Sequence, residues 1–135
     1  MASILKVDAM QGVTSAGDIT ITSEGGAATQ SLQQGLAKAW VNFNGEGTIA
    51  IRESINGSSL SDVGTGNYRL NFTSNMNSAT YSFQICSSSS VSNDGYNRSS
   101  LSLNLASQGA VNHYESGGTL TDTDLLTLNI HGDLA

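Results

Sequence analysis

The side chains able to carry acid–base, nucleophilic or metal chemistry are few in this chain and lie far apart. The two histidines, His113 and His131, have neither the His-x-His nor the His-x3-His spacing at which imidazoles share a metal ion. The single cysteine, Cys86, excludes an intramolecular disulfide and a cysteine-based metal cluster. The sequence therefore predicts no bound metal and no other cofactor.

The acidic and hydroxyl side chains give equally weak signals. Asp122 and Asp124 could offer oxygens to calcium, but the glycine and terminal glutamate of a calcium loop are missing, which favours a solvated turn. Glu46 falls in a predicted hairpin turn and Glu53 at a strand end, so nothing places them across a glycosidase cleft. No serine lies in a Gly-x-Ser-x-Gly elbow. We expect a protein that is not an enzyme.

Two tyrosines are better placed for contact with an outside ligand. An aromatic ring offers an apolar face and, in tyrosine, a polar handle. Tyr96 and Tyr114 fall in predicted loops, whereas Tyr68 and Tyr81 are in phase with predicted core residues. The loop tyrosines are therefore the aromatic contact candidates.

The elements that must position these residues are predicted from a strict two-residue alternation of apolar and polar side chains. Such alternation is typical of antiparallel strands with one covered face. The apolar sets are Ala39/Val41/Phe43, Ile49/Ile51, Tyr68/Leu70/Phe72, Tyr81/Phe83/Ile85, Leu101/Leu103/Leu105 and Leu126/Leu128/Ile130.

Short strands in this number favour an all-β fold, an antiparallel β-sandwich of jelly-roll-like type, over residues 37–135. Phe72, Phe83 and Leu103 are predicted to point into one interior. The polar strand faces, rich in Ser, Thr and Asn, are open to two interpretations, a solvated surface or a wet contact with another subunit.

Residues 1–36 differ from the rest of the chain, because they are rich in Gly, Ala, Ser, Thr and Gln and carry few large apolar groups. A short alternating piece covers residues 18–22, and a helical turn is predicted within residues 31–38, where Gly35 weakens it. We expect a tail or an arm that orders against a partner. The predicted domains are thus an attachment and oligomerisation arm, 1–36, and a sandwich, 37–135.

Charge narrows the set of partners. Five Lys and Arg against eleven Asp and Glu give a net charge of −6, with no basic cluster to bind nucleic acid or an anionic membrane. No apolar run approaches the roughly 20 residues of a membrane span, and residues 1–11 are too polar for a signal peptide. We therefore expect neither nucleic-acid binding nor membrane insertion. We expect the protein to be synthesised in a cytoplasm.

Several short segments of the sequence resemble a module of virion structural proteins of tailed bacteriophages, of the marine and cyanophage type. They are Ala37–Gly45 (AKAWVNFNG), Gly47–Arg52, Asp62, Gly64–Gly66, Asn71–Thr73, Tyr81–Ser82 and, less specifically, Ile4–Asp8. The resemblance covers residues 1 to 85. It implies a β-rich, trimeric tail fibre or appendage protein, located in the virion and made in the host cytoplasm.

The resemblance and the composition together give the predicted site residues. Virion attachment and trimerisation are assigned to Lys6, Val7, Ile19, Ile21 and Leu32, and distal contact to Asp94, Tyr96, Asn97, His113, Tyr114 and Glu115. The expected partners are two further copies of the chain, other virion proteins of tail, neck or capsid, and a host surface glycan or protein. The alternatives are a capsid decoration protein that stabilises the phage head and a carbohydrate-active virion enzyme, which the scarce carboxylates disfavour.

Overall fold

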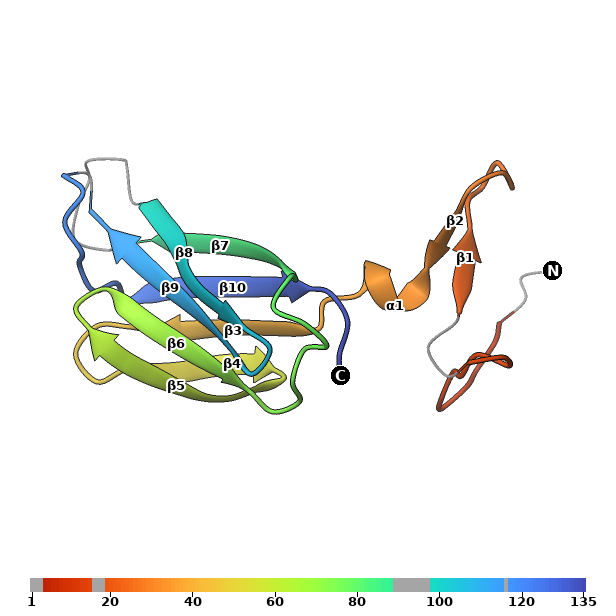
Figure 1. Cartoon of the computed structure of the whole chain (residues 1–135), viewed down its shortest axis with the longest axis horizontal. Helices are drawn as coiled ribbons and strands as arrows, with labels where there is room; N and C mark the ends of the chain where they lie inside the picture. Colours follow the sequence, from red (N-terminus) through yellow and green to blue (C-terminus); the bar gives the residue numbers. More distant parts are fainter. Residues whose placement is uncertain (1–3, 16–18, 89–97, 116) are drawn as a thin grey trace. The chain divides into compact units, whose positions relative to one another are not determined.

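The computed structural model describes residues 4–15, 19–88, 98–115 and 117–135, and the chain forms two compact units. They are Met1–Leu36 and Ala37–Ala135 (Figure 1).

The first unit is built around a small antiparallel hairpin. Strand β1 (Thr20–Thr22) pairs with β2 (Thr29–Ser31), and the helical turn α1 (Leu32–Gly35) follows directly. The Ser31 side chain caps α1 by accepting a hydrogen bond from Gln34 N at 3.4 Å. Strand β1 and the helical turn α1 fall in segments where the sequence predicts them, whereas β2 was not predicted.

The second unit is an antiparallel β-sandwich, which confirms the predicted all-β fold (Figure 1). One sheet has the order β4-β3-β10-β7 and the other β5-β6-β9-β8. The strands are β3 (Ala39–Asn44), β4 (Ala50–Ile55), β5 (Gly57–Gly64), β6 (Asn67–Phe72), β7 (Ser82–Ser88), β8 (Arg98–Leu105), β9 (Gln108–Tyr114) and β10 (Leu125–His131).

The apolar face of each sheet is covered by the other sheet. Buried residues of β3 and β10 in one sheet pack with those of β6 and β9 in the other, and Ile49, Ile51, Leu60, Phe83 and Ile85 complete the cluster. Alternation explains this packing, because Ala39, Val41 and Phe43 share one face of β3 while Trp40 and Asn42 share the opposite one. The core of the sandwich therefore lies where most of the predicted apolar sets place it.

The prediction that Leu103 points into this core is wrong. The pairing of β8 with β9 shifts between Leu101 and Leu103, so that Leu103 lies opposite Ala110 and Leu105 opposite Gln108. A register shift of one residue moves the following side chains to the other face of a sheet. Leu103 is half-buried outside the core cluster, and Leu105 is exposed.

Candidate functional site

The predicted attachment residues lie in the first unit, where they occupy different surroundings. Ile21 is the central residue of β1 and Leu32 the first of α1. Ile19, just before β1, accepts a hydrogen bond through its carbonyl from Leu32 N at 2.8 Å. Lys6 and Val7 are exposed. The hairpin therefore brings Ile19, Ile21 and Leu32 together.

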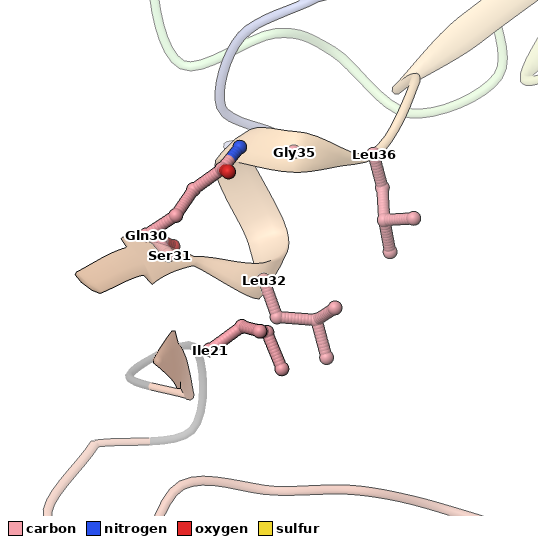
Figure 2. A pocket seen from close by; sticks show the side chains of 6 residues that line it. All are labelled: Ile21, Gln30, Ser31, Leu32, Gly35 and Leu36. Carbon is pink, nitrogen blue, oxygen red and sulfur yellow. The ribbon is translucent and has the colours of Figure 1, made fainter. Parts of the chain in front are cut away.

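The hairpin and α1 enclose an open, mainly apolar hollow of about 220 Å³, lined by Ile21, Gln30, Ser31, Leu32, Gly35 and Leu36. Figure 2 shows the Ile21 and Leu32 side chains next to each other, with the Gln30 side chain reaching toward Gly35. The Ile21–Gln30 pairing of β1 and β2 and the capped turn of α1 fix this shape. A second hollow of about 250 Å³ is lined by Ile21, Ser23, Ala28, Thr29 and Gln30.

Neither hollow has Lys6, Val7 or Ile19 in its lining. Leu36, in contrast, lines the first hollow and is absent from the predicted set. Leu32 and Leu36 are four residues apart, the spacing that puts two side chains on one face of a helical turn, and this signal could have identified Leu36.

The predicted distal residues separate into three groups. Asp94, Tyr96 and Asn97 lie outside the described residues. The loop assignment of His113 and Tyr114 is wrong, because both belong to β9. Glu115 follows that strand and is exposed.

His113 in particular cannot present its ring to an outside partner, since the residue is fully buried. Its Nδ1 lies 3.2 Å from Ser99 Oγ, and Ser99 Oγ donates to Ser87 Oγ at 2.9 Å. The Ser99 hydroxyl thus lies between Ser87 Oγ and His113 Nδ1. Nε2 has no hydrogen-bond partner in the described part of the chain.

Burial lowers the pKa of His113, and the charge of Asp122 opposes this effect. Tyr114 is half-buried at the end of β9, and its hydroxyl accepts a hydrogen bond from Asn112 Nδ2 at 3.2 Å. The Ser99–His113 contact therefore belongs to the interior of the sandwich.

Asp122 is tied to the fold through one of its carboxylate oxygens. Its Oδ1 accepts hydrogen bonds from Gly66 N at 2.7 Å and from the Tyr68 hydroxyl at 2.9 Å. Gly66 has a φ of 64°, and a Cβ there would lie 2.6 Å from the His113 carbonyl oxygen, so glycine is required at this close approach. Burial, then the hydrogen bond to Asp122, raises the pKa of Tyr68.

Tyr81 lies in a similar environment. Burial raises its pKa to about 12, and its hydroxyl donates to the Gln108 carbonyl at 2.9 Å. Both tyrosines are therefore core residues, in agreement with their sequence phase.

Two further observations concern metals and membranes. Within residues 4–15, 19–88, 98–115 and 117–135 no group of three or more His, Cys, Asp or Glu side chains is arranged to hold a metal ion. The helix found in those ranges is too short to cross a membrane.

Comparisons with protein-family models, with curated proteins and with solved structures find no match to this chain.

Proposed function

We propose that the chain is a non-enzymatic structural protein of a tailed-bacteriophage virion, a homotrimeric fibre or appendage subunit. In this proposal the unit Met1–Leu36 attaches and oligomerises, and the sandwich Ala37–Ala135 faces outward, with distal loops available to a host surface glycan or protein.

The observation that carries the proposal is the difference in burial between the two units. The sandwich buries a core of large apolar residues and leaves a few at 36 to 52% exposure, whereas the first unit contributes no residue to that core and exposes Ile4, Leu5, Val7, Met10, Val13, Ile21 and Leu36. Contiguous exposed apolar residues mark interaction sites in soluble proteins. A unit that buries so little of its own apolar surface is completed by association, which is the role of an attachment arm.

The sandwich supports the second half of the proposal. Its core draws on both sheets, so this unit has the interior that an outward-facing head requires. The resemblance of residues 1 to 85 to phage virion modules supports a role in the virion, and the net charge of −6 fits a protein partner better than nucleic acid.

The alternative is a capsid decoration protein, since an arm and a sandwich would serve equally well on a phage head. Copy number separates the two roles. Quantitative mass spectrometry of purified particles, with image reconstruction to locate the protein, is the test. Few copies at the tail or neck support the appendage role, and many copies over the shell support decoration. Absence from the particle contradicts both.

A further inference from the structure

The segment before the hairpin presents apolar side chains that nothing in its own unit covers. Ile4 is 79% exposed and Leu5 80%, and Val7, Met10 and Val13 are each more than half exposed. No backbone hydrogen bond between described residues involves residues 4–15. Among the described residues, this stretch therefore has apolar side chains that remain exposed and backbone groups that remain without a backbone partner.

The hollow between β1, β2 and α1 is a receptor of matching size and chemistry. Its apolar lining comes from Ile21, Leu32 and Leu36, with Ile21 half exposed and Leu36 more than half exposed (Figure 2). Its volume of about 220 Å³ is below the roughly 300 to 1,000 Å³ of small-molecule sites. An open hollow of this size fits one or two apolar side chains better than a free ligand.

We propose that residues Ile4–Val7 of a second copy of this chain pack into the hollow, with Leu5 as the central contact. The inference rests on the proposed function, in which the first unit is the self-association segment, and it identifies which surfaces meet.

Three observations favour a second copy as the occupant. Each copy carries both the uncovered side chains and the unfilled hollow, so one contact repeated around an axis satisfies both. A two-stranded sheet is marginal in water, and the three-residue strands of this one need covering. Finally, Lys6 is the single charge of Ile4–Val7 and Glu24 the single charge of Ile19–Leu36, so the two segments have charges of opposite sign although the whole chain is acidic.

The contact is heterologous, because different surfaces of the two copies meet. Heterologous contacts build closed rings when the rotation closes, which is how this interface would give a cyclic trimer.

Disulfide trapping tests the contact in the full-length protein. In a Cys86→Ser background, Leu5→Cys and Ile21→Cys are introduced into separate chains of different mass, mixed one to one and oxidised. The disulfide between Cys at 5 and Cys at 21 of different chains should exceed the two same-site disulfides. Val63→Cys, at a surface residue of the sandwich with 45% exposure, is the matched control and should not cross-link to either arm position.

A second variant pair provides an independent readout without oxidation. Burial of the Leu5 side chain contributes enough that Leu5→Asp should weaken self-association about tenfold or more in light scattering, while Leu5→Met keeps it. Both changes are at an exposed residue and leave the sandwich intact.

The outcomes distinguish this contact from the proposed function itself. An oligomeric protein without the 5–21 cross-link overturns the contact and leaves the virion role standing. In a further variant, Leu5→Cys and Ile21→Cys are placed in one chain. A disulfide formed within that chain means that the chain covers its own hollow, and also overturns the contact. A protein that stays monomeric at micromolar concentration and above overturns both the contact and the homotrimer.

Discussion

At the scale of single residues, the sandwich depends on the contact of Phe43 with Tyr68. Their rings meet edge to face, with centroids 5.2 Å apart and planes at 69°, a favoured geometry for aromatic pairs. The Tyr68 hydroxyl lies 2.9 Å from the Gly45 carbonyl oxygen, and a Cβ on Gly45 would lie 2.5 Å from that hydroxyl. This pair therefore fixes both the core and the start of the turn after β3.

The first prediction compares Phe43→Ala with Leu103→Ala. Phe43 is fully buried, and truncation of such a residue lowers the free energy of unfolding by about 3 to 5 kcal/mol. Leu103 is half-buried outside the core cluster because of the register shift in β8, so its truncation should cost much less. Urea denaturation of both variants measures the difference, and equal losses would mean that Leu103 points inward after all.

The second prediction concerns pH and His113. Burial lowers the pKa of this histidine in the folded state, whereas the unfolded chain keeps a value of about 6.5. As the pH falls below about 6.5, the unfolded state binds a proton that the folded state does not, so stability falls, by at most about 1.4 kcal/mol per pH unit. The loss ends at the folded pKa of His113. A charged imidazole carries protons on both ring nitrogens, and Nε2 of His113 has no hydrogen-bond partner among the described residues.

The control for this prediction is His113→Asn, which removes the titrating group. Denaturation midpoints measured from pH 8 to pH 5 should fall less steeply in the variant than in the parent, after allowance for the lower stability of the variant. Parallel curves would contradict the role given to His113.

At the scale of elements, a single residue connects the β4-β3-β10-β7 sheet to the β5-β6-β9-β8 sheet. Asn56 is the single residue between β4 and β5, and it has a φ of 57°, in the left-handed region that asparagine tolerates better than most residues. Its side chain accepts from Ser74 N at 2.7 Å and donates to the Ser74 carbonyl at 3.0 Å. Asn56 thereby ties this corner to the segment after β6.

The third prediction separates the two contributions of Asn56. Asn56→Gly keeps the left-handed backbone and loses the side-chain bonds, whereas Asn56→Ala loses the bonds and adds a backbone penalty of about 1 to 2 kcal/mol. Thermal or chemical unfolding should therefore rank the stabilities as parent, then Gly, then Ala. A glycine variant less stable than the alanine variant would show that the backbone conformation does not decide this corner.

The same scale explains which strands the sequence reveals. β3, β6 and β10 alternate cleanly because each inward position holds an apolar residue. β5 and β9 are missed: the inward residues of β9 include Gly109 and His113, and β5 contributes only Leu60 to the core cluster. A pattern of apolar residues cannot show a strand whose inward positions are filled by glycine, by histidine or by a single leucine.

The register shift in β8 and the hollow of the first unit were also beyond prediction, for a related reason. Leu101, Leu103 and Leu105 alternate perfectly, and the extra residue that moves the last two to the other face appears only in the pairing with β9. The hollow depends on which residue of β2 lies opposite Ile21, and that is a property of register as well. Composition alone separated residues 1–36 from the rest of the chain, but of the five predicted attachment residues Ile21 and Leu32 are those that line the hollow.

At the scale of the whole molecule, the division into Met1–Leu36 and Ala37–Ala135 places the buried apolar core in one part of the chain. The core cluster lies entirely in the second unit, and the first contributes no residue to it. Folding of the sandwich should therefore not require residues 1–36, whereas self-association should require them.

The fourth prediction follows from this division and is tested by the fragment Ala37–Ala135. The fragment should fold with the β-type circular dichroism of the sandwich, because every residue of its core is retained. It should be monomeric in light scattering, with a melting temperature independent of protein concentration, since only association makes that temperature concentration-dependent. The full chain at the same concentrations should be oligomeric.

Loss of the β-type spectrum in the fragment would mean that the arm stabilises the sandwich directly. A fragment that still forms the full-chain oligomer would instead move the subunit contact to the polar faces of the sheets, where Asn71 and Ser82 lie, and Asn71→Ala would then weaken assembly.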